Sequence, residues 1–192
     1  MSVSYSAKLA EAFAFAHRVH ADQFRKGRPV PFITHPMAVA ALVGEHGGTE
    51  LEVIAALLHD CVEDGDGLRT LEEIRAAFGE DVANVVWGCS DTHEQPKPPW
   101  RARKESFIEK MRSASPSIKQ VVTADKIHNA RALLALLADR SADVWHEFAG
   151  GREGTLWYYT AISDALGDGW NSDLLDVLNE EVAKLRVVIE VA

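Results

Sequence analysis

Cysteine and long apolar runs are scarce in this chain of 192 residues, and each scarcity argues against a class of protein. The two cysteines, Cys61 and Cys89, lack CxxC spacing, so we expect no disulfide framework and a reducing, cytoplasmic location. No apolar run is long enough to span a bilayer. Residues 1–6 lack the basic and apolar regions of a signal peptide.

Positive charge is also in the minority. Lysine and arginine number 20 against 29 aspartates and glutamates, which gives a net charge of −9 at pH 7. This balance argues against a general affinity for nucleic acid or for an anionic membrane. An anionic small molecule would therefore require a local basic pocket.

Helical periodicity recurs along the chain, whereas strand-like alternation and internal repeats do not. Thr34 and Thr49 are suited to N-cap positions, and Thr70 with Glu73 has the spacing of a capping box. We therefore predict an all-α helical bundle of about eight to ten helices. The predicted helices cover residues 4–23, 36–45, 49–64, 70–78, 81–89, 100–113, 116–137, 143–148, 155–166 and 174–188.

One of these predicted helices changes from apolar to acidic along its length. Residues 54–58 are apolar, and the ionisable side chains His59, Asp60, Glu63 and Asp64 follow them. Residues three and four apart share a helix face, so these groups would be crowded together. Carboxylates repel one another, and burying an unpaired charge is costly. Either a solvated helix end or a bound cation would relieve the repulsion.

Two more residues with metal-ligand chemistry lie elsewhere. His35 follows the expected start of a helix, and Asp125 interrupts an apolar run. Lys126 is adjacent to Asp125 but points about 100° away on an ideal helix. The partner of Asp125 is therefore either a cationic side chain from another helix or a metal ion, and the residues alone leave both open.

The order His35, His59-Asp60 and Asp125 resembles the pattern of the HD superfamily of metal-dependent phosphohydrolases. The resemblance is closer to the hydrolase domain of RelA/SpoT homologues, including the small stand-alone hydrolases of the metazoan SpoT-homologue type. It rests on Arg25-Lys26, His35-Pro36, Leu58-His-Asp-Cys-Val-Glu-Asp64 and Ala124-Asp-Lys-Ile-His-Asn-Ala-Arg131. We predict an HD-type domain over residues 1–167 and a helical extension packed on it over residues 168–192.

The resemblance implies a metal site and a catalytic pair. It implies one divalent ion, manganese in preference to zinc, iron or another first-row metal. The implied ligands are His35, His59, Asp60 and Asp125, a set of imidazoles and carboxylates that suits such an ion. Glu63 and Asp64 match the family's acidic pair, which is linked to activating the attacking water.

The resemblance also implies contacts with a nucleotide. Arg25 and Lys26 match the family's basic loop, and Asn129 matches an asparagine expected to contact sugar or phosphate. Tyr159 aligns roughly with an aromatic near the pocket, although Tyr158 or plain core packing are equal alternatives.

Other residues near these motifs also have expected roles. We expect structural roles for Lys126 and His128, and a buried ion pair for Arg131. Residues 92–104 depart from the family pattern. Their cations are expected either to contact substrate, Lys97 first among them, or to form an exposed loop and a charged helix face.

The implied reaction is hydrolysis of the 3′-pyrophosphate of (p)ppGpp, or of a related alarmone, by attack of a metal-bound water. One alternative keeps the site and changes the substrate to a nucleoside monophosphate or the 2′-phosphate of NADPH. A second alternative is a non-catalytic nucleotide-binding helical module with a structural metal. We expect a small-molecule nucleotide partner, no nucleic acid, no membrane, and a C-terminal helix that serves packing or a homodimer.

Overall fold

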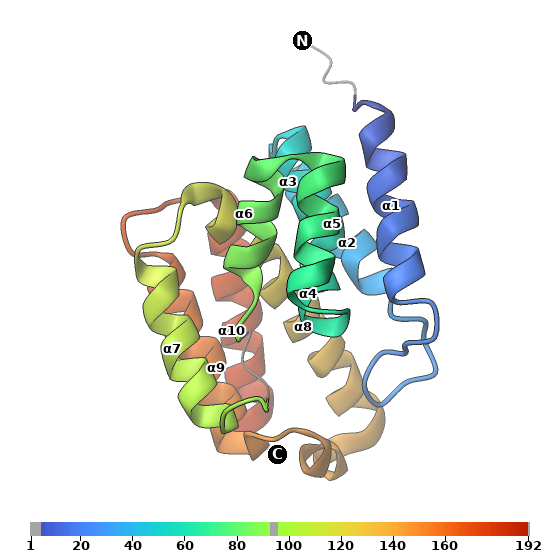
Figure 1. Cartoon of the computed structure of the whole chain (residues 1–192). Coiled ribbons are helices and arrows are strands. Elements are labelled where there is room, and N and C mark those ends of the chain that lie inside the picture. Colours follow the sequence, from blue (N-terminus) through green and yellow to red (C-terminus); the bar gives the residue numbers. More distant parts are fainter. Residues whose placement is uncertain (1–4, 93–95, 192) are drawn as a thin grey trace.

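The computed structural model describes residues 5–92 and 96–191, and these residues form an all-α bundle (Figure 1). They contain no β-strand, only an isolated bridge between Phe24 and Pro31. The predicted fold class is confirmed. The helices are α1 (Ala7–Val19), α2 (Thr34–Glu45), α3 (Glu50–Leu58), α4 (Cys61–Asp64), α5 (Leu68–Phe78), α6 (Glu80–Cys89), α7 (Trp100–Arg112), α8 (Pro116–Arg140), the 3-10 helix η1 (Ser141–Glu147), α9 (Gly151–Leu166) and α10 (Asp173–Val191).

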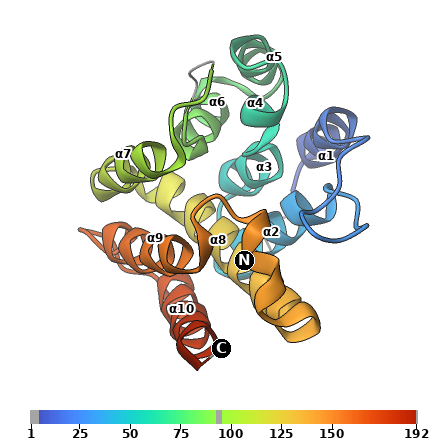
Figure 2. The same cartoon turned by 90° about the horizontal axis from the view of Figure 1, so that it is seen from below.

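Two helices lie at the centre of the bundle. Residues 53–59 at the end of α3 and residues 119–125 of α8 are buried without interruption. Seven consecutive residues cover nearly two turns of a helix, so every face of these stretches is covered. Helices α1, α2, α6 and α8 surround α3, while α8 also contacts α9 and α10 (Figure 2).

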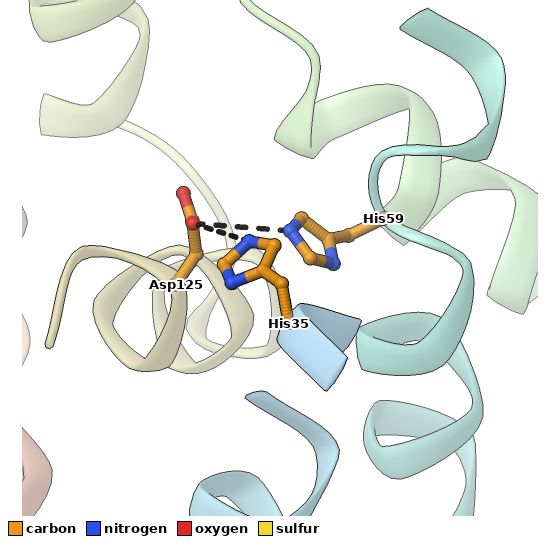
Figure 3. A group of neighbouring side chains, drawn as sticks. All are labelled: His35, His59 and Asp125. Carbon is orange, nitrogen blue, oxygen red and sulfur yellow. Dashed lines mark ion pairs between the residues drawn. The ribbon is translucent and has the colours of Figure 1, made fainter. Parts of the chain in front are cut away.

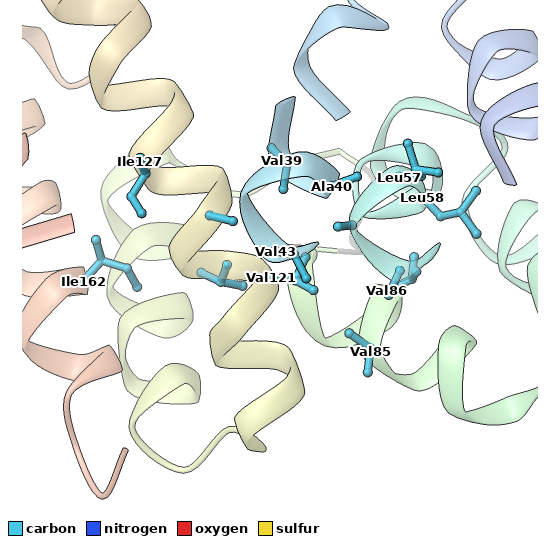
Figure 4. Close-up of a cluster of buried hydrophobic side chains, with 14 of the residues drawn as sticks. Val39, Ala40, Val43, Leu57, Leu58, Val85, Val86, Val121, Ile127 and Ile162 are labelled. Atoms are coloured by element: carbon cyan, nitrogen blue, oxygen red, sulfur yellow. The ribbon is translucent and has the colours of Figure 1, made fainter. Parts of the chain in front are cut away.

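The hydrophobic core joins these central helices into one continuous cluster. Figure 4 shows how the branched side chains of α2 meet those of α3, α6 and α8. Among them, Val39, Val43, Leu58 and Val86 are fully buried. This packing fixes α2, α3 and α8 against one another, and these are the elements that carry the predicted metal ligands.

Local signals at helix starts are only partly confirmed. Thr49 forms the predicted N-cap, and with Glu52 it makes a full capping box at the start of α3. Thr34, predicted as an N-cap, is instead the first residue of α2, and its hydroxyl donates to the carbonyl of Pro31 at 2.8 Å. The predicted box of Thr70 with Glu73 is wrong, because α5 begins earlier and the Thr70 hydroxyl accepts from a backbone N–H within the preceding turn.

The predicted helix over residues 49–64 is interrupted. Helix α3 ends at Leu58 and α4 begins at Cys61, with His59 and Asp60 as a turn between them. Both turn residues keep right-handed helical dihedrals, and the N–H of Asp64 still bonds the carbonyl of Asp60 at 3.0 Å. The interruption leaves the acidic pair one turn beyond Asp60, as on a continuous helix.

The C-terminal helix α10 packs against α8 and α9. Arg131 of α8 forms an ion pair with Glu181 of α10 at 3.0 Å, but only the Glu181 side chain is buried, whereas that of Arg131 is 47% exposed. The division of the chain at residue 167 stays a prediction. No helix within the described ranges is both long enough and apolar enough to cross a membrane. Residues 1–4, part of the segment tested for a signal peptide, lie outside those ranges.

Candidate metal and phosphate site

The four predicted metal ligands converge where α2, the α3–α4 turn and α8 meet, and Figure 3 shows three of them, His35, His59 and Asp125. Nε2 of His35 lies 3.2 Å from Oδ1 of Asp125 and 3.4 Å from Oδ2 of Asp60. Nε2 of His59 lies 3.2 Å from the same Asp60 oxygen and 3.9 Å from Asp125 Oδ1. Two ring nitrogens and two carboxylates, drawn from three separate segments, therefore point into one small space.

One nitrogen in this cluster is buried without a hydrogen bond. His59 is 3% exposed, and its Nδ1 donates to the carbonyl oxygen of Ala56 at 2.8 Å. In the neutral ring, that bond places the hydrogen on Nδ1 and leaves a lone pair on Nε2, which has no hydrogen-bond partner among the described residues. Buried polar atoms are normally bonded. A lone pair facing carboxylate oxygens is satisfied by a cation, so this donor set fits a divalent metal.

The carboxylates dominate the electrostatics of the cluster. Burial lowers the pKa of His59, but Asp60 and Asp125 outweigh it and raise this pKa to about 9. Burial raises the pKa of both carboxyls, yet His59 brings that of Asp60 well below its ordinary value, and Lys126 and His35 do the same for Asp125. The cluster therefore attracts positive charge. A metal ion would displace the proton from His59, since metal binding releases protons from its ligands.

Lys126 and Asn129 hold the carboxylate of Asp125 from the same helix. Lys126 Nζ lies 2.6 Å from Asp125 Oδ2, and the Asn129 amide donates to Oδ1. The prediction that Lys126 points away from Asp125 is wrong, because the flexible lysine side chain folds back along the helix. Burial lowers the pKa of Lys126, but Asp125 raises it well above its ordinary value. Lys126, the neighbour of Asp125 on α8, is thus one partner of this carboxylate, beside the imidazoles of His35 and His59.

The acidic pair Glu63 and Asp64 lies on α4, beside the metal-ligand cluster. Glu63 Oε1 bonds the ammonium of Lys97 at 2.8 Å. Asp64 is 3.9 Å from Nδ1 of the buried His20. Burial, with the charges of Asp60 and Glu63, raises the pKa of Asp64 to about 6. The two acids therefore differ in environment, one bonded to a cation and one partly desolvated.

A cavity of about 810 Å³ is bordered by the residues that follow Asp125 on α8. Among the described residues, its lining holds five cationic side chains and no aspartate or glutamate: Arg25, Lys26, Arg28, Lys104 and Lys126. Against a net charge of −9, this is the local basic pocket that an anionic ligand requires.

Arg25 and Lys26 reach the cavity from the loop between α1 and α2, where Gly27 takes a φ of 72°. The Arg25 guanidinium donates to Asn129 Oδ1 at 2.7 Å, and the Lys26 ammonium lies 4.5 Å from the ring centroid of Phe148. In the described part of the chain, neither cation has a carboxylate within ion-pair distance. Both are therefore free to meet an anion.

Helix α7 reaches the cavity through Trp100 and Lys104 in its first turns, whereas Lys97, in the loop before it, is not in the lining. The Trp100 ring packs on Gly150, where a Cβ would come within 2.5 Å of it. One face of this indole is thus covered by backbone and cannot stack a base. Residues 93–95 of the same loop lie outside the described residues.

The remaining cations of this segment have partners in the protein. Arg103 and Lys104 both bond the carboxylate of Asp91, at 2.6 Å. The Arg101 guanidinium lies 3.3 Å from the ring centroid of Trp157 and also bonds Glu105. The prediction of a charged helix face therefore applies to Arg101, whereas the ion pair with Asp91 holds Lys104 at the cavity.

Tyr159 is 7% exposed and borders the cavity together with Tyr158. Lys126 and His128, expected to be structural, border it as well. A signal for His128 was available, because it lies three residues after Asp125 and so shares its helix face. Phe148 carried no such signal, because it lies in an irregular connection that only packing brings to the cavity.

Comparisons with known proteins agree with this geometry. The family described as HD domain matches residues 12–156. The chain is 40% identical over 136 residues to the guanosine-3′,5′-bis(diphosphate) 3′-pyrophosphohydrolase MESH1 of Danio rerio, which covers 69% of this chain and 73% of the relative. It is 36% identical over 149 residues to a probable guanosine-3′,5′-bis(diphosphate) 3′-pyrophosphohydrolase of Synechocystis, covering 72% of this chain but only 18% of that longer relative.

A solved structure has the same fold. It is described as a metazoan ortholog of SpoT that hydrolyzes ppGpp, and it superimposes with a TM-score of 0.77 at 26% sequence identity. The match covers 95% of this chain and 98% of that one. The likeness therefore includes the C-terminal region as well as the segment matched by the family.

Proposed function

The chain belongs to the HD-domain family, and from this premise we propose that it is a metal-dependent phosphohydrolase of nucleotides. Its proposed substrate is (p)ppGpp or a related alarmone, from which the 3′-pyrophosphate is removed. One observation carries the proposal: a buried imidazole lone pair and two carboxylates lie next to a cavity lined by five cations. The names of the similar enzymes from Danio rerio and Synechocystis supply the substrate.

We assign His35, His59, Asp60 and Asp125 as ligands of one divalent metal. HD-domain hydrolases bind divalent metals, and manganese is our choice among them because mixed nitrogen and oxygen donors suit a first-row ion. When bound, the ion would polarise a phosphoryl oxygen and make a water more acidic. The protein's part is to hold the four donors in place, which the packed core between α2, α3 and α8 supports.

We assign Glu63 and Asp64 the role of accepting the proton that the attacking water loses. A general base must lie within reach of that water, and both acids lie within one turn of Asp60. The ion pair with Lys97 fixes the direction of the Glu63 carboxylate. Water attacks the phosphorus attached to the ribose 3′ oxygen, and the bond from that phosphorus to the 3′ oxygen breaks. The 3′ oxygen leaves and takes up a proton, so the products are pyrophosphate and GDP or GTP.

We assign Arg25, Lys26 and Asn129 to the substrate, with Lys97 and Tyr159 as further contacts. The two cations have no carboxylate partner among the described residues, so a phosphate does not have to displace one. Arginine and lysine offset the charge that develops on the phosphoryl oxygens during transfer. Lys104 and Lys126 line the same cavity and add to its positive potential.

The test is a screen of nucleotides with purified, manganese-loaded protein, with and without chelator. The screen includes ppGpp, pppGpp, nucleoside monophosphates and NADPH. We expect pyrophosphate release from the two alarmones, lost on chelation. Rapid phosphate release from another nucleotide with none from the alarmones would keep the site and replace the substrate. Binding without any turnover would reject the enzyme in favour of a nucleotide-binding module.

Replacing Glu63 by glutamine tests the assigned base. We expect Glu63→Gln to lower kcat by at least about 10²-fold, the typical contribution of a positioned base, while metal content stays unchanged. Metal content is measured by elemental analysis after gel filtration. The matched control is Glu11→Gln, an exposed carboxylate on α1, which should leave kcat unchanged. Normal turnover in Glu63→Gln would remove Glu63 from the mechanism.

A further inference from the structure

His128 lies on α8, three residues beyond Asp125, with its ring against that of His35. The Nδ1 atoms of the two rings are 2.7 Å apart, which is a hydrogen-bond distance. Two ring nitrogens at this separation share one hydrogen: one of them donates it and the other accepts it. Which ring donates follows from what the other nitrogen of His35 does.

The surroundings of Nε2 of His35 determine which of the two rings donates this hydrogen bond. Its Nε2 lies among the oxygens of Asp60 and Asp125. A metal ligand must offer a lone pair, so the hydrogen of a ligating His35 is on Nδ1. Nδ1–H of His35 then donates to Nδ1 of His128, and the hydrogen of the neutral His128 ring is on Nε2.

The two histidine ligands are thus supported differently. His59 donates its Nδ1–H to the peptide carbonyl of Ala56, within its own helical turn. His35 donates instead to a side chain from another helix, and that side chain also borders the basic cavity. The ring of His35 is therefore held from α8, the helix that carries Asp125.

We propose that His128 is a positioning residue for the metal site, which fixes the tautomer and orientation of His35 through the Nδ1–Nδ1 hydrogen bond. The inference rests on the proposed function, because it requires His35 to be a ligand. Partners of this kind typically change metal affinity by about 10- to 100-fold when they are removed. The His128 ring also borders the basic cavity, so it lies between His35 and the space assigned to substrate.

The test compares two substitutions of His128 in the full chain. His128→Leu removes the acceptor, whereas Asn in His128→Asn offers an oxygen near the position of the imidazole Nδ1. We expect His128→Leu to raise the dissociation constant for Mn²⁺ by about 10- to 100-fold, and His128→Asn to recover most of the loss. Isothermal titration calorimetry on chelator-treated protein measures the constant. His146→Gln, which changes an exposed histidine, is the control and should bind as the wild type does.

The possible outcomes distinguish a failure of the positioning role of His128 from a failure of the proposed metal site. If the wild type binds Mn²⁺ and His128→Leu binds it equally well, the positioning role is rejected and the metal site stands. If the wild type binds no Mn²⁺, the metal site itself is rejected, and the inference with it. Should His128→Leu fail to fold, ¹⁵N NMR of the zinc-loaded wild type replaces it. A His128 ring with its hydrogen on Nε2 is expected there, and one with its hydrogen on Nδ1 overturns the inference.

Discussion

At the scale of single residues, Asp91 shows how one buried carboxylate fixes a wall of the cavity. Its side chain is 7% exposed and bonds both Arg103 and Lys104 in the first turns of α7. Lys104 in turn lies in the cavity lining, with its ammonium 4.9 Å from the ring centroid of Tyr158. Asp91 therefore places a cation that the sequence alone presents as one of several in a charged stretch.

Replacing Asp91 by asparagine should destabilise the protein in a pH-dependent way. Breaking a buried ion pair by removing one partner costs about 3 kcal/mol, and we expect Asp91→Asn to lose about this much at pH 7. Burial raises the pKa of Asp91, but Lys104 and Arg103 outweigh it, and the net pKa lies below the ordinary value. The stabilisation is therefore present above about pH 4 and fades as the pH falls through the lowered pKa.

Urea unfolding of both proteins between pH 7 and pH 3 measures this difference. The gap in unfolding free energy should be widest near neutral pH and shrink below about pH 4. A gap that widens on acidification would contradict the assignment of an ionised, paired Asp91.

At the scale of elements, Lys119 ties the ends of two helices to the central one. It lies near the start of α8, is 2% exposed, and its ammonium donates to the carbonyl oxygens of Arg112, Leu166 and Asp168. The first two are the last residues of α7 and α9. A cation at helix C-termini satisfies carbonyls that have no partner within the helix and complements the helix dipole. Burial lowers the pKa of Lys119, and the charge of Asp168 offsets this only in part.

Lys119→Met should therefore be strongly destabilising. Methionine keeps the apolar volume but leaves three carbonyls without their donor, at about 1–3 kcal/mol for each group left unsatisfied. We expect a total loss of about 3 kcal/mol or more, measured by urea unfolding. Lys8→Met, at an exposed position on α1, is the matched control and should change stability by less than about 0.5 kcal/mol. Equal stability of the two variants would show that Lys119 is dispensable.

At the scale of the whole molecule, the proposed metal ligands come from segments that are distant in sequence and adjacent in space. His35 lies near the start of the chain, Asp125 in its second half, and the turn of His59 between them. A bound ion would cross-link α2, the α3–α4 turn and α8 in the folded state alone. Binding should therefore stabilise the whole bundle.

Metal addition should raise the unfolding free energy through this linkage. At a free Mn²⁺ concentration of 100 times its dissociation constant, the expected gain is about 2.7 kcal/mol, with a matching rise in melting temperature. Differential scanning calorimetry with and without chelator measures it. His59→Ala should fold and show no such gain. A gain of equal size in His59→Ala would place the ion elsewhere on the molecule.

Other whole-molecule predictions stay open to experiment. A cytoplasmic location and a dimer through the C-terminal helix remain predictions, as does manganese in preference to other first-row metals. The acidic surface and the basic cavity do have a joint consequence. The cavity offers a polyanionic nucleotide local positive charge against a net charge of −9, and the absence of a general affinity for nucleic acid stays a prediction.

The sequence by itself determined the features that depend on local order. The helical class, the N-cap of Thr49 and the start of α8 at Pro116 depend on signals that lie within one or two turns of chain. The order of His35, His59, Asp60 and Asp125 also predicted four side chains that the structure brings together, and their role as metal ligands remains a proposal. Such patterns are readable because their spacing follows the 3.6-residue period and the unpaired groups at helix ends.

Only the tertiary structure decided which side chains meet across elements. The pairs Lys97 with Glu63 and His35 with His128 join segments that no sequence pattern relates. The break at His59, where a continuous helix was predicted, likewise belongs to the packing of the centre. The physical reason is that long side chains have several rotamers of similar energy in an isolated helix, and the shape and charge of the neighbouring elements select among them.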